Sequence, residues 1–363
     1  MLEVGPGKTY SAPSKAAAVA QNGDTIHIAA GDYRGDVASW FASNLTICGV
    51  GGRARMFADG NNAEGKGIWV FNMPNTTTTT VVNVEFHDAK VPDQNGAGIR
   101  LDGGSLVLRN AGFYDNENGI LGGNGGTTLT IESSEFSGNG FGGDGHTHNI
   151  YVGFADRVNV KASYFHHAHV GHNFKSRAKE NYVEDSYFVD GTTGNSSYLL
   201  DFPNGGLVFL RGNLLHKGPN ADNSILVSFN AEPGSFGVTW PINTVTMLHN
   251  TVVTTYGSGA YLYVPGDTQA VTLTANLFAG NAGLVSGGFA STKIVQQNNF
   301  TTTASNVPGA ANAQFWPAAS ILSQLGLATV PDAQYVNDSP QPMQLRPINS
   351  ASARKIGALQ AAP

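Results

Sequence analysis

The chain has 363 residues and a formal net charge of -6, and 46 of its residues are glycine whereas only 13% are charged. An average globular domain has ~7% glycine and ~25% charged residues, so this composition excludes a mainly helical protein. The hydrophobic fraction of 41% is sufficient for a core. No apolar run reaches the ~18 residues of a membrane-spanning helix, and the acidic balance argues against a general binder of nucleic acid or of anionic membranes.

The N-terminal residues have the pattern of a cap on a repetitive fold. Residues 14–21 are rich in alanine and precede an alternating strand at residues 24–28, so we expect a short helix that covers the first coil. Residues 1–30 are therefore the predicted cap and first coil. Cys48 is the one cysteine and follows apolar strand residues, so we expect it to be buried and to form no intramolecular disulfide.

A repeat of about 25 residues occupies residues 31–300. Each copy starts with a short strand of alternating apolar and polar residues. A polar pair follows, and then an apolar residue that we call the anchor. The anchors are Phe86, Phe113, Phe136, Phe165, Phe188, Leu215, Val252, Phe278 and Phe300. Short strands separated by Gly and Asn turns, without a helical segment, exclude leucine-rich, ankyrin and tetratricopeptide arrays. We predict an all-β fold, a right-handed parallel β-helix of about ten coils whose anchors form an internal ladder.

Asparagine precedes several anchors, and it tolerates the left-handed backbone conformation. We therefore expect the tight turn between the first and second strands at Asn110, Asn213, Asn250, Asn276 and Asn298. Residues 301–363 lose the repeat and are rich in Ala and Pro, which indicates a C-terminal cover. No linker interrupts the pattern, so we predict a single domain over residues 1–363.

The strands that follow the anchors were aligned to find residues on one face. Their first inward apolar residues are Ile99, Ile120, Ile150, Phe174, Tyr198, Ile225 and Tyr261. Because strand side chains alternate, the residues one and three places later point outward and form columns on stacked coils. This alignment predicts one patch with His148, Tyr151, His172, Lys175, Arg177 and Asp201.

The histidines of the chain are concentrated near this patch. Residues 146–172 contain His146, His148, His166, His167, His169 and His172. In a chain poor in charge, such a concentration indicates a functional site. Other interpretations remain open: the histidines could be bonded loop residues, and Asp144 with His146 and His148 could bind zinc, although no Cys or Glu completes the ligand set.

Two segments resemble a known superfamily. Residues 23–35 resemble the first coil of pectate-lyase-like β-helix proteins, and residues 343–350 are similar to their closing segment. This superfamily includes lyases, hydrolases, epimerases and non-enzymatic spikes, so the resemblance implies a fold before it implies an activity. The stretches around His148 and Lys175 also look like a separate group of bacterial β-helix proteins.

A narrower resemblance concerns the patch. Lys175 and Ser176, followed by Asn181 and Phe188, resemble the Lys-Ser-x-x-Asn stretch of polysaccharide lyase family six, the alginate lyases and chondroitinase B. The resemblance implies that Lys175 is the catalytic base. The assisting arginine of that family has no counterpart at residues 198–201, and its acidic calcium ligands have none at residues 149–152.

The patch supplies the groups for β-elimination on a uronic-acid polysaccharide. This reaction needs a cation to neutralise the carboxylate, a base for the C5 proton and an acid for the leaving oxygen. We expect Lys175 to be the base and Arg177, with Arg100, to bind the carboxylate, because a guanidinium matches it bidentately. The predicted acid is Tyr151 or His172, and the reverse assignment, with the Tyr or His as base and Lys175 as acid, stays open. His148 would orient these groups, and further substrate contacts are expected from His146, His169, Asp201, Asn149 and Asn173.

Other activities remain open at this point. The alternatives are a uronan C5-epimerase, a glycoside hydrolase that uses two of Asp144, Asp201 and Asp222, and a non-catalytic carbohydrate-binding β-helix. We expect an anionic polysaccharide as partner, no nucleic acid or membrane, and a monomer. We assign no cofactor and leave calcium possible. The first residues lack the pattern of a signal peptide, so we expect a secreted or periplasmic protein from which it has been removed, with a cytosolic protein as the alternative.

Overall fold

The computed structural model describes residues 1–142, 146–328, 335–336, 343, 346–347 and 354–360. The fold is an all-β parallel β-solenoid with about 11 turns and 6% helix, which confirms the predicted fold class and is close to the predicted coil number. Within these residues no helix is both long and apolar enough to span a membrane. Most of the predicted closing segment, residues 343–350, lies outside the described residues.

The chain divides into two compact units. Unit 1 contains residues 1–159 and 168–171, and unit 2 contains residues 160–167 and 172–363. The division passes through strand β15 (Arg157–Lys161). The single domain expected from the sequence stays a prediction, and each unit is described separately below.

Unit 1 consists of three parallel ladders and one short helix. The first ladder contains β1 (Leu2–Val4), β2 (Thr25–Arg34), β4 (Thr46–Phe57), β6 (Thr78–Val82), β9 (Ser105–Arg109) and β12 (Thr128–Glu132). In the second, β4 continues into a stack with β7 (Val84–His87), β10 (Gly112–Tyr114) and β13 (Glu135–Ser137). The third contains β3 (Ala38–Trp40), β5 (Gly67–Asn72), β8 (Ala97–Gly103), β11 (Asn118–Gly122) and β14 (Ile150–Val152). The predicted cap helix is α1 (Pro13–Ala17), which ends four residues earlier than expected.

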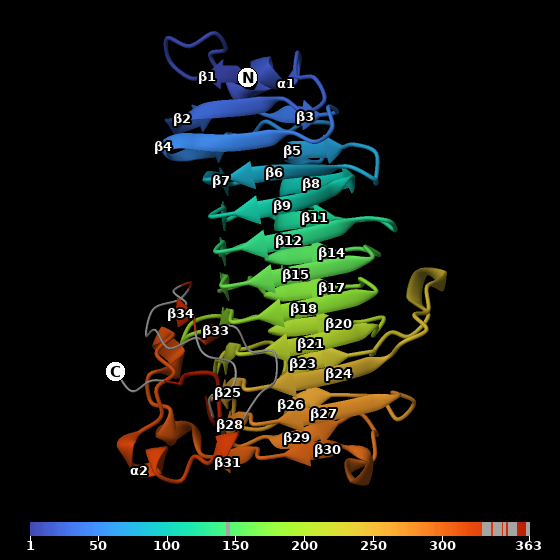
Figure 1. Cartoon of the computed structure of the whole chain (residues 1–363), viewed down its shortest axis with the longest axis vertical. Coiled ribbons are helices and arrows are strands. Elements are labelled where there is room, and N and C mark those ends of the chain that lie inside the picture. The colour runs from blue at the N-terminus through green and yellow to red at the C-terminus, as the bar shows by residue number, and fades with distance from the viewer. Residues whose placement is uncertain (143–145, 329–334, 337–342, 344–345, 348–353, 361–363) are drawn as a thin grey trace. The chain divides into compact units, whose positions relative to one another are not determined.

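Unit 2 repeats the same three ladders (Figure 1). The first contains β18 (Glu180–Glu184), β21 (Leu207–Arg211), β24 (Thr244–Leu248), β27 (Ala270–Thr274) and β30 (Val295–Gln297). The second contains β16 (Tyr164–His166), β19 (Tyr187–Val189), β22 (Leu214–Lys217), β25 (Thr251–Thr254), β28 (Leu277–Ala279) and β31 (Phe300–Thr302). The third contains β17 (Phe174–Ser176), β20 (Leu200–Phe202), β23 (Ile225–Phe229), β26 (Ala260–Tyr263) and β29 (Gly283–Ser286).

The remaining elements of unit 2 are short. The helices are η1 (Ser235–Gly237), η2 (Ser291–Lys293), η3 (Ala304–Asn306), η4 (Ala310–Asn312) and α2 (Ala319–Leu322). Two antiparallel pairs join β32 (Leu327–Ala328) to β35 (Arg354–Lys355), and β33 (Tyr335–Val336) to β34 (Arg346–Pro347).

The predicted anchors stack within each unit. In unit 1 the rings of Phe86 and Phe113 lie 5.1 Å apart and those of Phe113 and Phe136 lie 4.5 Å apart, both nearly parallel. In unit 2, Phe165 stacks on Phe188 at 4.9 Å. These side chains are fully buried, so the ladder supplies much of the apolar core.

The last anchor was predicted in the wrong register. Phe300 pairs with Leu277, and it is Thr301 that pairs with Phe278. Phe300 packs instead against the apolar cluster outside the coils, which contains Leu277. The sequence around Phe300 lacks the flanking apolar residues that would fix which face the ring takes.

The left-handed corner between the first and second strands lies where expected in only part of the repeat. Asn110 and Asn298 occupy it, with φ of 49° and 54°. In three other coils the corner residue is Gly212, His249 or Ala275, with φ of 67°, 50° and 54°. The asparagine in those coils is the next residue, so the expectation was wrong by one position at Asn213, Asn250 and Asn276.

These three asparagines form an internal ladder instead. The backbone and side-chain amides of Asn213 donate to Oδ1 of Asn250, at 2.9 and 3.0 Å. Asn250 donates in the same way to Asn276, at 2.9 Å for both bonds. All three are fully buried, and the side-chain oxygen of each accepts the N–H of the residue after the corner in a neighbouring coil.

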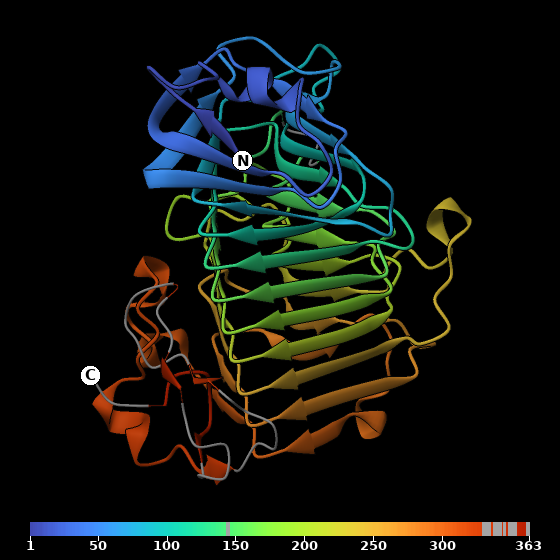
Figure 2. The ribbon, with the colours of Figure 1, turned by 45° about the horizontal axis from the view of Figure 1, so that its top comes forward.

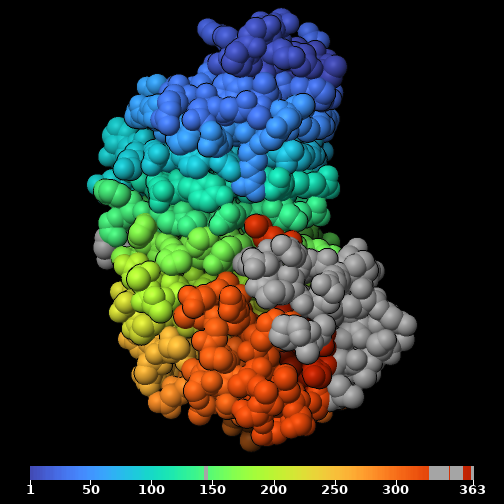
Figure 3. Space-filling view, turned by 90° about the vertical axis from the view of Figure 1, so that its left-hand side faces the viewer, coloured from blue at the N-terminus to red at the C-terminus, as the bar shows by residue number. Residues whose placement is uncertain are grey.

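The segment after β31 covers one outer face of unit 2. Buried apolar side chains from this face and from the segment form one cluster, which contains Tyr187, Val189, Leu214, Val253, Leu277, Ala279, Val307, Ala310, Ala313, Phe315, Leu325, Ile356, Ala358 and Leu359. The orange residues of the segment are seen from outside in Figure 3, and Figure 2 shows their ribbon beside the strands. The cluster explains why these outward strand positions are apolar.

Candidate active site

Strands β17, β20, β23 and β26 of unit 2 align four outward side chains. Lys175 pairs with Asp201, Asp201 pairs with Ser228, and Ser228 pairs with Tyr263. The sequence alignment was therefore wrong here by two residues, because it placed Asp201 beside Arg177. Since side chains alternate with a period of two, this shift keeps Asp201 on the outward face but gives it Lys175 as its neighbour.

The cause of the shift is the local sequence. Phe174 pairs with Leu200, whereas the alignment had used Tyr198. Residues 198–200 are Tyr-Leu-Leu, and a continuous apolar run does not define which residue points inward. For the same reason Ile225 pairs with Ala260 and not with Tyr261.

Asp201 is the centre of the polar group. Its Oδ2 lies 3.3 Å from Nε2 of His172 and 3.8 Å from Nζ of Lys175. Burial alone would raise the pKa of Asp201, but the hydrogen bond from His172 and the positive charge of Lys175 act in the opposite direction, and the pKa is lowered. Asp201 is therefore an ionised carboxylate shared by two donors.

His172 has a defined tautomer in this arrangement. Its Nδ1 accepts a hydrogen bond from the backbone N–H of Tyr198 at 3.3 Å, so the ring proton lies on Nε2 and points at Asp201. Burial lowers the pKa of His172 despite its bond to Asp201, and the ring is neutral at neutral pH. With its one N–H directed at Asp201, His172 is positioned to orient the carboxylate, and the acid role that the sequence suggested for it stays a prediction.

Tyr198 is a site residue that the sequence reasoning missed. Its ring lies 4.9 Å from the His172 ring and its side chain is half-buried. Burial and the negative charge of Asp201 raise the pKa of the Tyr198 phenol, while the neighbouring Asn223 amide acts in the opposite direction. A phenol that keeps its proton is a candidate general acid. The correct strand register would have revealed it. Leu200 pairs with Phe174, so Tyr198 stands two residues before Leu200 as His172 stands two residues before Phe174.

Arg177 follows β17 and is engaged by other residues of unit 2. Its Nη1 donates to Oδ1 of Asn204 and its Nη2 to Oε2 of Glu232, both at 2.6 Å. The Phe236 ring lies over the guanidinium at 4.9 Å. Glu232 and Phe236 belong to the yellow segment with η1 that stands out from the strands in Figures 1 and 2. The guanidinium expected to bind a substrate carboxylate is thus occupied by a carboxylate of the chain itself.

Two asparagines predicted to bind substrate are internal. Asn149 is fully buried in unit 1, and its Oδ1 accepts the backbone and side-chain amides of Asn139 at 3.2 and 2.8 Å. Asn173 is fully buried in unit 2, and its amide donates to Asp190 at 3.2 Å. Neither side chain reaches the surface, so we remove both from the proposed substrate contacts.

The other predicted residues belong to unit 1. His148 is buried and packs edge-on against the half-buried Tyr151, with ring centres 5.4 Å apart. His146 and His169 are exposed. Arg100 donates from Nε to Asp102 at 3.0 Å. The roles that the sequence suggested for these five residues remain predictions.

No metal site emerges from the described side chains. Among them, no group of three or more His, Cys, Asp or Glu side chains is placed to hold an ion. Asp144, part of the zinc alternative, lies outside the described residues.

Known structures resemble this fold. Pectate lyase Pel9A matches with a TM-score of 0.60 and 15% identity over 99% of this chain and 92% of its own. The fold is that of a pectate-lyase-like parallel β-helix. An alginate lyase from Paenibacillus sp. str. FPU-7 matches at 0.49 with 17% identity, over 80% of this chain and 95% of its own. ORF18 of Geobacillus virus E2 matches at 0.40 with 14% identity, over 76% of this chain and 52% of its own. No family profile and no curated relative matches the sequence.

Proposed function

We propose that this protein is a polysaccharide lyase that cleaves a uronic-acid-containing polysaccharide by β-elimination. The observation that carries the proposal is the grouping of Lys175 and His172 on the Asp201 carboxylate in unit 2, with the Tyr198 ring 4.9 Å from the His172 ring. The similarity to Pel9A supports the fold on which such a site is built and does not define the activity.

Lys175 is the proposed base. Its side chain is 13% exposed, and its Nζ lies 3.8 Å from Oδ2 of Asp201. In its neutral form Lys175 takes the C5 proton, the electron pair forms the C4–C5 double bond, and the C4–O bond breaks. Asp201 holds the amine in place, and His172 fixes the carboxylate by the hydrogen bond from Nε2.

Tyr198 is the proposed acid. Its phenol protonates the leaving oxygen, and the raised pKa keeps the phenol protonated at neutral pH. Arg177 is the proposed partner of the substrate carboxylate, whose neutralisation makes the C5 proton acidic. In this role the substrate carboxylate takes the place that Glu232 occupies in the free protein.

The test is turnover of a panel of uronans, with the ultraviolet absorbance of the unsaturated product as signal. We expect cleavage of at least one of alginate, pectate, glycosaminoglycans and glucuronan. Lys175→Ala is expected to lower kcat on the order of 100-fold or more, as for loss of a general base. Lys179→Ala is the matched control, because Lys179 is an exposed lysine four residues away.

Two results would contradict the proposal. One is the absence of unsaturated product from every uronan of the panel. The other is full activity of Lys175→Ala, which would remove the site even if the activity class were right. Incorporation of solvent deuterium at C5 without cleavage would replace the lyase by a C5-epimerase, which shares the proton abstraction.

A further inference from the structure

Unit 2 contains a fully buried ionic pair that a substrate cannot reach. Lys217 ends β22 and Asp190 follows β19, and both side chains are fully buried. Nζ of Lys217 lies 3.8 Å from Oδ2 of Asp190. A buried charge is costly unless it is paired and hydrogen-bonded, so its bonding partners show which part of the chain it stabilises.

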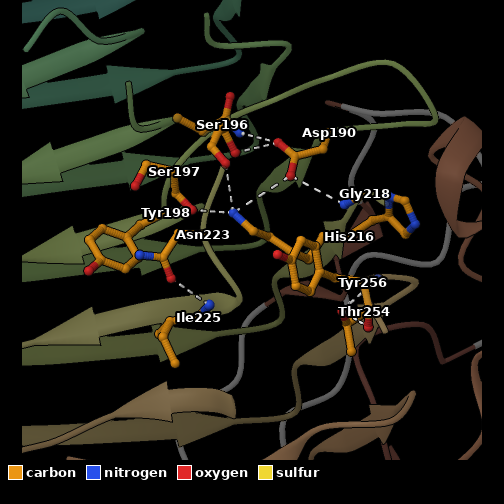
Figure 4. A network of polar contacts seen from close by, with 12 residues as sticks. Asp190, Ser196, Ser197, Tyr198, His216, Gly218, Asn223, Ile225, Thr254 and Tyr256 are labelled. Carbon is orange, nitrogen blue, oxygen red and sulfur yellow. Dashed lines mark hydrogen bonds and ion pairs between the residues drawn. The ribbon is translucent and has the colours of Figure 1, made fainter. Parts of the chain in front are cut away.

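The hydrogen-bond partners of Lys217 lie in the connection between β19 and β20 (Figure 4). Nζ of Lys217 donates to the carbonyl oxygen of Ser196 at 2.9 Å and to that of Ser197. Asp190 accepts the hydroxyl group of Ser196 and the N–H of Gly218, the latter at 3.2 Å. This connection contains no helix or strand, so the ionic pair supplies polar contacts that define its path.

The connection ends at the candidate site. Tyr198 follows Ser197 directly, and its N–H is the donor to Nδ1 of His172. The backbone N–H of Asn173, the residue after His172, donates to the Tyr198 carbonyl oxygen at 3.1 Å. The side chain of Asn173 donates to Asp190 at 3.2 Å. The residues next to His172 and Tyr198 are therefore both hydrogen-bonded to the buried pair, Asn173 to Asp190 and Ser197 to Lys217.

We propose that Lys217 is a positioning residue for the candidate site. Its ammonium group fixes the carbonyl groups of Ser196 and Ser197, and thereby places the Tyr198 N–H that selects the Nε2-protonated tautomer of His172. Lys217 acts through the chain, since its side chain has no exposed surface. Only the consequence for catalysis depends on the proposed lyase function, because the tautomer can be observed directly.

The test compares the imidazole nitrogens of His172 by NMR in the wild type and in Lys217→Met, which keeps the unbranched shape and removes the charge. We expect the wild type to have its proton on Nε2, and the variant to show both tautomers in exchange. Leu215→Met is the matched control, because it alters a buried side chain of the same strand that pairs with Phe188. A folded Lys217→Met protein with the wild-type His172 pattern would overturn the proposal.

A titration of the wild type gives a second test that needs no variant. Burial lowers the pKa of Lys217 to about 8, opposed by the charges of Asp190 and Asp222, which face it. The neighbouring His216 stays neutral, because burial lowers its pKa to about 4. Loss of the ammonium charge weakens its bonds to the two carbonyl groups, so the His172 nitrogen signals should move with a midpoint near pH 8. His172 signals that stay constant while the Nζ signal of Lys217 shows the loss of its proton would contradict the proposal.

Kinetics separate this proposal from the proposed function. Where a uronan is cleaved, we expect Lys217→Met to lower kcat on the order of 10-fold with little change in KM. A changed tautomer without any lyase activity supports the positioning role and refutes the function. An active wild type whose kcat and His172 pattern are unaffected by Lys217→Met refutes the positioning role alone.

Discussion

Arg177 and Glu232 form an ion pair in which one partner is buried and the other is largely exposed. The 2.6 Å contact joins Nη2 to Oε2, and the side chains are 4% and 44% exposed. Arg177 lies two residues after Lys175, the proposed base. A side-chain rotation can move the exposed Glu232 carboxylate away from Arg177. The buried guanidinium stays in place, because it also donates to Asn204.

Glu232→Ala tests whether Glu232 occupies the position at Arg177 where the substrate carboxylate would bind. If Glu232 competes with the substrate for Arg177, its removal increases the fraction of protein ready to bind, and KM falls by about 10-fold. We expect a loss of stability of about 1 to 3 kcal/mol, because the buried Arg177 guanidinium loses a carboxylate partner. Steady-state kinetics and urea unfolding measure the two effects.

The matched control for Glu232→Ala is Glu184→Ala. Glu184 pairs with Arg211 at the same distance of 2.6 Å, on the first strand ladder of unit 2. We expect this control to leave KM unchanged. A KM that rises in Glu232→Ala would show that the pair holds the site together and does not block it.

Tyr198→Phe tests the proposed acid. The variant retains the ring against His172 and loses only the hydroxyl group, so we expect kcat to fall on the order of 100-fold while KM changes little. Because the phenol pKa is raised, ionisation of Tyr198 should reduce wild-type activity only above the usual tyrosine range. The pH–rate profile of the variant should lack that alkaline decline.

Tyr182→Phe is the control for Tyr198→Phe. Tyr182 lies on β18, where its ring packs near Phe209. It should leave kcat at the wild-type value. Equal losses in the two variants, or none in Tyr198→Phe, would mean that another group protonates the leaving oxygen.

The fold was predictable because its signal is repeated. Phe86, Phe113 and Phe136 recur at similar intervals and are buried in the same internal ladder, so an error in one coil does not change the conclusion. The register of a single coil has no such redundancy. The apolar run at residues 198–200 does not show which residue points inward. The alignment of Asp201 was therefore wrong by two residues, and Tyr198 was overlooked.

The contacts of Arg177 could not be predicted for a different reason. Its partner Glu232 is 55 residues away, in a segment without periodicity. Hydrophobic patterns identify faces of strands, but they carry no information on which polar groups a loop brings to them. The asparagine ladder illustrates the same limit: the sequence predicted a turn at Asn250, and only the structure shows that this side chain is a buried hydrogen-bonding group.

Asp185→Asn is predicted to stabilise the protein in a pH-dependent way. Burial raises the pKa of Asp185 to about 7, and the positive charge of Arg211 compensates only in part. In the described part of the chain, Oδ2 of Asp185 has no hydrogen-bond partner. The folded state binds this proton more tightly than the unfolded state, so the wild type loses stability as the pH rises from about 4 to 7. Asparagine also tolerates the left-handed conformation of this residue, whose φ is 49°.

Urea unfolding at several pH values measures this effect. At pH values above 7, Asp185→Asn should exceed the wild type by about 1 to 3 kcal/mol, and the difference should disappear in acid. Equal destabilisation of the variant at every pH would show that the carboxylate makes a contact that the amide cannot replace.

Asn250→Ala is predicted to be among the most damaging single changes in unit 2. The Asn250 side chain accepts two bonds from Asn213 and donates to Asn276 and to the carbonyl oxygen of Leu210. Alanine leaves these groups buried without partners, at a cost of about 3 to 5 kcal/mol.

Asn281→Ala is the control, since that exposed amide makes one bond to Gly257, and we expect a change below about 0.5 kcal/mol. Chemical unfolding of both variants decides the point: similar losses would mean that the ladder contributes little and that the anchors alone hold adjacent coils together.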